Sequence, residues 1–103
     1  MQMKAYSSDE TLIVRLDGEI DHHSAGEIRE GLDRMIAETR PKALVLELSD
    51  IDFMDSSGLG LVLGRYRRLH EIGSQMFIKN PSARTEKILA MAGVDKLIKI
   101  IRA

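Results

Sequence analysis

Residues 43–60 read ALVLELSDIDFMDSSGLG, and this stretch decides the fold class. Residues 43–48 are nearly all apolar, as expected of a central strand that is covered on both faces. A helix should begin near Asp55 or Ser56, whose side chains can cap free backbone N–H groups, and should end near Glu71. We expect its buried face to carry apolar residues at helical spacing, namely Leu59, Val62, Leu63, Tyr66 and Leu69.

The chain before this stretch predicts a hairpin and a first helix. Residues 11–16 are rich in β-branched side chains and place Leu12, Val14 and Leu16 on one face, and residues 3–7 can pair with them. Residues 24–27 (SAGE) have the form of a capping box, with Ser24 as the N-cap, and a helical stripe of apolar residues follows them. The dipeptide at 40–41 (RP) ends that helix.

The chain after residue 71 predicts a strand at 75–79, a third helix and a last strand at 97–101. Asn80 should cap this helix with Pro81 at its first position, and Gly93 should end it. Its expected apolar face consists of Ile88, Leu89, Met91 and Ala92. The alternation of strands and helices predicts an α/β fold. We expect a single domain over residues 1–103, with a mixed, mostly parallel sheet of four to five strands and about three helices.

The composition favours a soluble domain that folds without crosslinks. Of its 103 residues, 44% are hydrophobic and 30% are charged, which suits a hydrophobic core rather than a disordered chain. There is no cysteine, which excludes disulfides, thiolate zinc sites and a cysteine nucleophile. No apolar run is long enough for a membrane span or a signal region, so we expect a cytoplasmic protein.

The formal net charge of −1 hides an uneven distribution along the chain. Residues 1–60 carry 13 acidic and 6 basic side chains, whereas residues 61–103 carry 3 acidic and 9 basic ones. A basic half can indicate nucleic-acid binding, but here the bases are scattered and aromatic residues make up only 4% of the chain. We therefore expect solvated helix faces and no nucleic-acid partner.

The glycine- and serine-rich segment after the central strand does not fit common enzyme motifs. A dinucleotide loop would need a glycine at position 63, which is Leu63, and a phosphate loop would need Lys followed by Ser or Thr after Gly64. A nucleophile elbow would need a glycine where Asp55 stands. A small hydrolase that uses Ser56 or Ser57 is an alternative from another functional class, and we do not favour it.

The glycines of this segment need a reason, because glycine inside a helix costs about 1 kcal/mol relative to alanine. Gly60 and Gly64 share a helix face, so close packing against the sheet is one explanation. Gly58 lies beside the serines and could let another molecule approach the backbone.

The triplet Asp21-His22-His23 raises the question of a metal site. In an extended loop adjacent histidines point in opposite directions, and no third ligand has a suitable spacing. We therefore predict no metal site and regard the triplet as a polar loop that enters the helix after Ser24.

A serine at a helix N-terminus suits reversible modification. A phosphate there would meet free backbone N–H groups and the positive end of the helix dipole. Its charge of about −1.5 to −2 would add to that of Asp55 and Asp52, and could repel an acidic partner. The residues thus suggest a binding switch, and the alternative is that Ser56 and Ser57 only cap the helix together with Asp55.

Three stretches resemble the anti-sigma factor antagonists of the STAS domain family, and most of all those that act in sporulation. They are residues 16–23 (LDGEIDHH), 53–60 (FMDSSGLG) and 63–66 (LGRY), and the likeness extends over nearly the whole chain. Members of that family usually have a further C-terminal helix, whereas this sequence ends at 102–103 (RA).

The resemblance implies a regulatory role without enzyme activity and without a cofactor. The second serine of the motif, here Ser57, would be phosphorylated by the anti-sigma factor, itself a serine kinase, and a PP2C-type phosphatase would reverse this. The unphosphorylated form would bind the kinase and free the sigma factor.

The resemblance also implies partner contacts near the acceptor, at Asp21, Asp55, Ser56, Gly58 and Gly60. We expect a monomer that forms hetero-complexes and has no membrane partner. A stress-response antagonist of another sigma factor is the alternative within the family.

Overall fold

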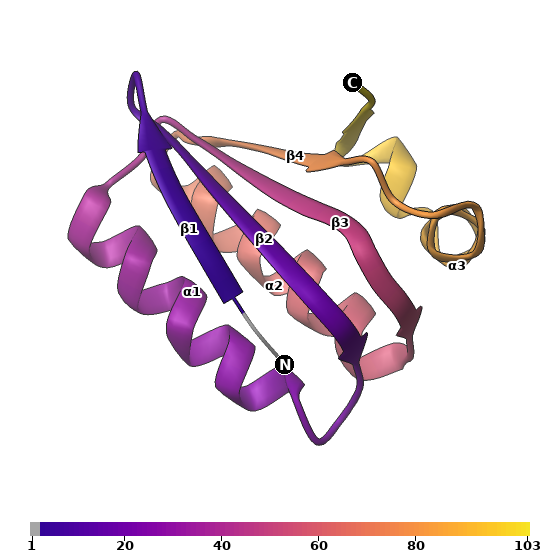
Figure 1. Cartoon of the computed structure of the whole chain (residues 1–103). Coiled ribbons are helices and arrows are strands. Elements are labelled where there is room, and N and C mark those ends of the chain that lie inside the picture. The colour runs from indigo at the N-terminus through magenta and orange to yellow at the C-terminus, as the bar shows by residue number, and fades with distance from the viewer. Residues whose placement is uncertain (1–2) are drawn as a thin grey trace.

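The computed structural model describes residues 3–103, in which five strands form one sheet in the order β1-β2-β3-β4-β5 (Figure 1). Along the chain the elements are β1 (Met3–Ser8), β2 (Thr11–Ile20), α1 (Ala25–Thr39), β3 (Ala43–Met54), α2 (Ser56–Glu71), β4 (Gln75–Lys79), α3 (Ala83–Met91), a short 3-10 turn η1 (Val94–Lys96) and β5 (Lys99–Ile101). The predicted single α/β domain, its mixed sheet and its three helices are confirmed.

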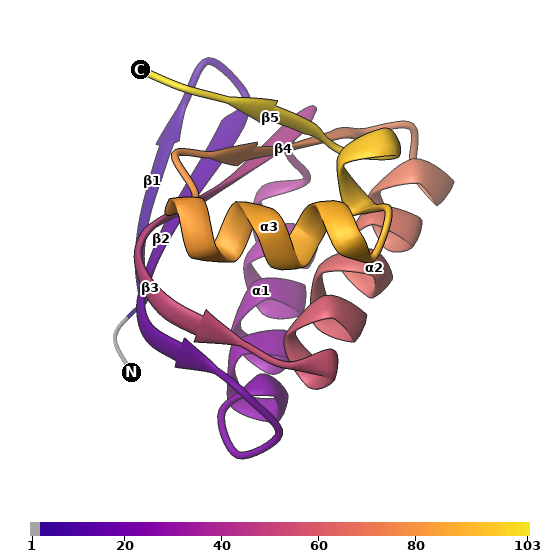
Figure 2. The same cartoon turned by 90° about the vertical axis from the view of Figure 1, so that its right-hand side faces the viewer.

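The sheet is antiparallel only between β1 and β2, which form the predicted hairpin, and the remaining pairs are parallel. Crossover helices therefore join β2 to β3, β3 to β4 and β4 to β5, as the alternation in the sequence predicts. Figure 1 shows α1 and α2 side by side behind β1–β3, and Figure 2 shows α3 lying beside β4 and β5. The carboxyl ends of β2 and β3 consequently meet at one edge of the sheet.

Strand β3 extends beyond the apolar run at residues 43–48 and ends at Met54. Its partner β2 has register irregularities between Arg15 and Asp17 and between Gly18 and Glu19, which bend this end of the sheet. Gly18 has a φ of 93°, a left-handed conformation that glycine adopts without strain. The last strand, in contrast, is shorter than expected and begins only at Lys99.

The buried face of α2 differs from the predicted one. Its buried residues are Gly58, Leu61, Val62, Arg65 and Leu69, while the predicted Leu59, Leu63 and Tyr66 are only partly buried. The core lies between the helices and the sheet, and it includes Leu89 of α3 and Val94 of η1. The face of α2 that meets the strand ends contains Gly58 and Leu61.

The two predicted helix caps differ in outcome. Ser24 is the N-cap of α1 as predicted, but its side chain makes no capping hydrogen bond to the helix. Its hydroxyl instead donates to the Glu19 carbonyl oxygen at 2.9 Å. The N-cap of α3 is Ser82, whose hydroxyl accepts from the Thr85 N–H at 3.1 Å, and not Asn80.

The start and end of α3 explain the remaining differences in this region. Asn80 has a left-handed φ of 52°, and its side chain accepts from the Ala103 N–H, so it belongs to the loop before the helix. Met91, expected in the core, is 80% exposed. Gly93 has a φ of 75° and ends the helix as predicted.

Candidate functional site

Two loops that are distant in the sequence lie together at the carboxyl edge of the sheet. Ile20, the last residue of β2, pairs with Met54, the last residue of β3. The Asp55 N–H then donates to the Ile20 carbonyl oxygen at 3.2 Å. The loop of residues 21–24 and the helix start at residues 55–57 are therefore neighbours, and these contain most of the residues that the sequence singles out.

Asp55 holds the start of α2. Its carboxylate oxygen Oδ1 accepts from the Ser57 N–H at 2.8 Å and the Gly58 N–H at 3.3 Å, as expected of an N-cap. Ser56 is exposed and Ser57 is half-buried. Within residues 3–103 the Ser57 hydroxyl makes no hydrogen bond, so it is not used to hold the fold.

Asp21 organises the neighbouring loop. Its Oδ1 accepts from the N–H groups of His23 and Ser24, each at 3.0 Å. The hydrogen bond from the Ser24 N–H, followed by that from the His23 N–H, holds the pKa of the Asp21 carboxyl below its usual range. A charged carboxylate at this position thus shapes the loop beside Ser57.

The two histidines do not point in opposite directions. Their ring centroids lie 3.9 Å apart with an interplanar angle of 39°, because residues 22–24 form a turn rather than an extended segment. Within the part of the chain that the structure describes, no group of three or more His, Cys, Asp or Glu side chains could hold a metal ion.

The glycines of α2 serve different purposes from those expected. A Cβ at Gly58 would lie against the Met54 side chain and 2.8 Å from the Ile20 carbonyl oxygen. Gly58 is buried, so the close approach that it permits is between α2 and the strand ends, and not to another molecule. Gly60 and Gly64 have nothing within 4 Å of an added Cβ, so packing against the sheet does not explain them.

A hollow of about 550 Å³ opens between the first turns of α1 and α2. Its polar lining includes Ser57, His22, Arg29 and Arg65, and Gly26 and Gly60 widen it. Arg65 is only 9% exposed, and sequence reasoning missed it. The signal was its spacing, because position 65 continues the buried row 58, 61, 62 and 69.

A model of the STAS domain matches residues 2–103 of this chain. The chain belongs to the STAS domain family. An anti-sigma F factor antagonist of Paenibacillus polymyxa is 39% identical to it over 89 residues, which cover 86% of this chain and 76% of that protein. An anti-sigma-B factor antagonist of Staphylococcus aureus is 24% identical over 100 residues, which cover 97% and 92% of the two chains.

Solved structures of the antagonist SpoIIAA have the same fold. The unphosphorylated form matches with a TM-score of 0.85 and the phosphorylated form, from Bacillus, with a TM-score of 0.77, both at 31% identity. Each match covers 99% of this chain, and 88% and 91% of the SpoIIAA chains respectively. The predicted resemblance to the antagonist family is thereby confirmed.

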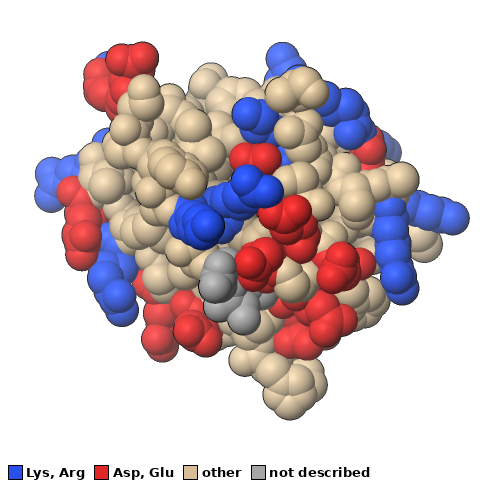
Figure 3. Space-filling model, in the orientation of Figure 1, with Lys and Arg blue, Asp and Glu red and all other residues tan. Residues whose placement is uncertain are grey.

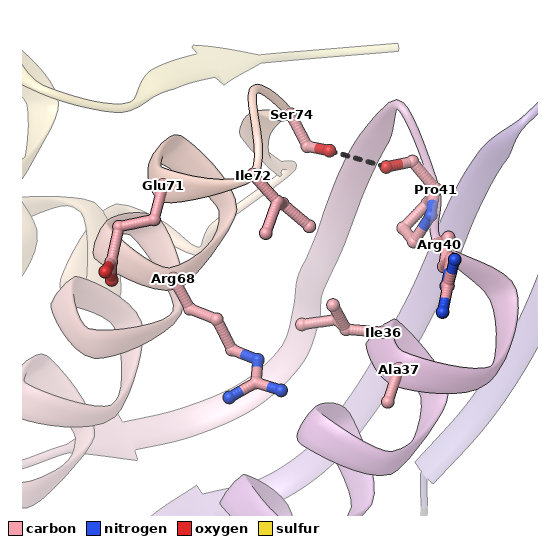
Figure 4. Close-up of a pocket in the computed structure, with 8 residues that line it drawn as sticks. All are labelled: Ile36, Ala37, Arg40, Pro41, Arg68, Glu71, Ile72 and Ser74. Carbon is pink, nitrogen blue, oxygen red and sulfur yellow. Dashed lines mark hydrogen bonds between the residues drawn. The ribbon is translucent and has the colours of Figure 1, made fainter.

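A second hollow of this STAS domain, of about 670 Å³, lies at the other end of α1 and α2. Figure 4 shows its lining, in which Ile36 and Ile72 face each other and the Ser74 hydroxyl donates to the Pro41 carbonyl oxygen at 2.7 Å. None of the residues that the sequence singled out as a candidate site lies in it, so the site of interest is the edge with Ser57.

Charge is unevenly spread over the surface as well as along the chain. Figure 3 shows acidic side chains gathered toward the lower right of the view, over the ends of β2 and β3, and basic ones on the right, toward α3. Exposed acids of these strand ends are Glu19, Asp50 and Asp52. No helix within residues 3–103 has the length and apolar character needed to cross a membrane.

Proposed function

We propose that this STAS domain is an anti-sigma factor antagonist that phosphorylation of Ser57 switches off. In its unphosphorylated form it binds an anti-sigma factor kinase, and this binding frees the sigma factor. The observation that carries the proposal is the Ser57 hydroxyl, which makes no hydrogen bond within residues 3–103 and lies at the start of α2 beside the loop of Asp21. The names of the two antagonist relatives support the same role.

The switch is a phosphoryl transfer that the partners catalyse. The kinase transfers the γ-phosphoryl group of ATP to Oγ of Ser57, and the hydroxyl proton and ADP are released. A PP2C-type phosphatase returns the hydroxyl by hydrolysis, with inorganic phosphate as the other product. The ATP and the metal ions belong to these partners, so this domain is a substrate and needs no cofactor.

Electrostatics explain why phosphorylation would end binding. The phosphate adds about −1.5 to −2 charges to a surface that already carries Asp21, Asp55 and the exposed Asp52. A kinase surface that fits the unphosphorylated edge would then meet both a larger group and a stronger negative potential. We expect partner contacts at Asp21, Asp55, Ser56 and Gly60, whereas the buried Gly58 acts only through packing.

A serine hydrolase is the competing function that the site itself raises, since His22 and Ser57 line the same hollow. A catalytic histidine would have to accept a hydrogen bond from the serine hydroxyl. Here the His22 ring lies against His23, and no hydrogen bond joins it to Ser57 within residues 3–103. Absence of labelling by a fluorophosphonate probe would agree with the antagonist role, and labelling at Ser57 would contradict it.

The sigma factor that is controlled is proposed to be of the sporulation type. The P. polymyxa relative, at 39% identity, is named for sigma F, which we take as the sporulation-type factor, whereas the S. aureus relative named for sigma B is 24% identical. A neighbouring gene for an anti-sigma F kinase would support the sporulation circuit. A neighbouring stress-response operon would instead favour an antagonist that acts on a stress-response sigma factor.

The binding switch is tested with two variants that each remove one hydroxyl. Ser57→Ala should bind an anti-sigma F kinase like the wild type and should stay bound when ATP is added. Ser56→Ala is the matched control, and ATP should release it as it releases the wild type. Release of Ser57→Ala by ATP would locate the switch elsewhere.

A further inference from the structure

We propose that the phosphate on Ser57, once present, is held within the domain by Arg29 and Arg65 across the hollow between α1 and α2. The inference rests on the proposed function for the origin of the phosphate. It concerns the phosphorylated state of the domain, namely which side chains contact the phosphate. All three residues line the same hollow: Ser57 lies in the first turn of α2, Arg29 in α1 and Arg65 in the middle of α2.

Arg65 is a buried cation whose bonding capacity is only partly used. It is 9% exposed, and its Nε forms an ion pair with Oδ1 of Asp33 at 3.0 Å. Its buried Nη1 makes no hydrogen bond within residues 3–103. Burial lowers the pKa of Arg65, which marks the cost of keeping this charge away from water. An anion in the hollow would supply the missing acceptors.

Arg29 supplies a second guanidinium from the opposite wall. It is exposed on α1, so its side chain is free to turn toward the hollow. It lies close enough to Arg65 for the two charges to repel each other, which adds to the lowering of the Arg65 pKa by burial. Two like charges that repel each other across a hollow are stabilised by an anion between them, and arginine forks suit phosphate oxygens.

The walls of the hollow leave room for the phosphate. An added Cβ at Gly26 or Gly60 would meet nothing within 4 Å, so the walls of the hollow are open at these two positions. The first turns of α1 and α2 both border the hollow, and their positive dipole ends favour an anion there.

Other charged and titratable groups also face this region. Asp33 competes for Arg65, and Arg68 Nε lies 3.8 Å from the same Asp33 oxygen, so Asp33 keeps a partner if Arg65 turns away. The Asp21 and Asp55 carboxylates are turned toward the backbone N–H groups that they cap. His22 lines the hollow and would add a third cation when protonated.

The test uses protein in which phosphoserine is incorporated at position 57 during translation, so that it needs no kinase. ³¹P NMR then follows the second pKa of the phosphate, which is about 6 for phosphoserine. We expect a pKa lower by about 0.5–1 than that of a phosphoserine peptide, as nearby cations and helix ends favour the dianion. Arg29→Gln should recover at least half of this difference.

The matched control is Arg67→Gln, which removes the same charge from an exposed position of α2 that does not line the hollow. It should leave the phosphate pKa close to that of the unsubstituted protein. Because a substitution at the buried Arg65 endangers the fold itself, its role is read in the unsubstituted protein, where the Nε–H signals of Arg29 and Arg65 should shift on phosphorylation.

Each outcome decides the proposal. A phosphate pKa equal to that of the peptide, or one lowered equally in the Arg29→Gln and Arg67→Gln proteins, would overturn it, and the latter would assign the effect to the helix ends alone. Unshifted arginine signals would also overturn it. A lowered pKa that depends on Arg29, in a protein that no anti-sigma kinase phosphorylates, would uphold the arginine contacts and refute the proposed switch.

Discussion

The N–H of Asp55 donates to the carbonyl oxygen of Ile20 at 3.2 Å, and this bond joins the end of β2 to the start of α2. It is the point at which the two loops of the candidate site meet. The bond requires close approach of the two backbones, and Gly58 is the residue that allows it. The shape of the proposed kinase-facing edge therefore depends on a glycine that is itself buried.

Gly58→Ala should destabilise the domain strongly, since its methyl group would lie 2.8 Å from the Ile20 carbonyl oxygen, a backbone atom that the Asp55 N–H also binds. Overpacking of this kind typically costs about 1–3 kcal/mol. Gly60→Ala is the matched control, because an added Cβ meets nothing within 4 Å there. It should stabilise the helix by about 0.5–1 kcal/mol. Urea unfolding of both variants measures the difference, and equal midpoints would refute the packing role of Gly58.

Much of this edge was predictable because local rules govern it. A buried strand followed by Asp-Ser-Ser indicates a helix start, and Asp55 caps α2 as the sequence suggests. This helix start also predicts that Ser57 lies in the first turn of α2. The hairpin of β1 and β2 and the parallel order of the later strands also follow from pattern alone.

The remaining features depend on contacts between distant segments, which no local pattern contains. Arg65 is buried because it shares a face of α2 with Gly58, and this face packs against Ile20 and Met54. The close, tilted contact between the His22 and His23 rings arises from a turn that Asp21 stabilises. Ser82 and Asn80 are both good capping residues, and only the left-handed conformation of Asn80 decides between them.

Asp55 is expected to have two separable roles, as a helix cap and as a partner contact. Asp55→Ala removes the acceptor of the Ser57 and Gly58 N–H groups, and should cost about 0.5–2 kcal/mol of unfolding free energy. Asp55→Asn keeps an acceptor oxygen and should retain most of that stability. If the carboxylate charge contacts the kinase, Asp55→Asn should nevertheless bind it more weakly in isothermal titration calorimetry. Wild-type affinity of a stable Asp55→Asn protein would remove this contact from the proposal.

Asp21 should make stability depend on pH in the acidic range. Hydrogen bonds from Ser24 and His23 lower the pKa of its carboxyl in the folded protein, whereas the unfolded chain has a pKa of about 3.9. The stabilisation is therefore complete above the unfolded pKa and is lost as pH falls through the lower, folded pKa.

We accordingly expect Asp21→Asn to have a lower urea midpoint than the wild type at about pH 6, and the difference between the two midpoints to narrow as the pH falls below the unfolded pKa toward about pH 2. Asp95→Asn removes the same charge from the exposed η1 turn, away from the loop of Asp21, and controls for net charge. A gap that stays constant over this range for Asp21→Asn would contradict a stabilising role of the ionised carboxylate.

Phosphorylation at Ser57 is the central claim, and mass spectrometry after incubation with an anti-sigma F kinase and ATP tests it most directly. Intact mass followed by peptide mapping should show one added phosphoryl group, located on Ser57. The same reaction with Ser57→Ala should leave the mass unchanged. No added mass on the folded wild-type protein, with a kinase that modifies its own antagonist in a parallel sample, would contradict the claim, and so would an added group on Ser56.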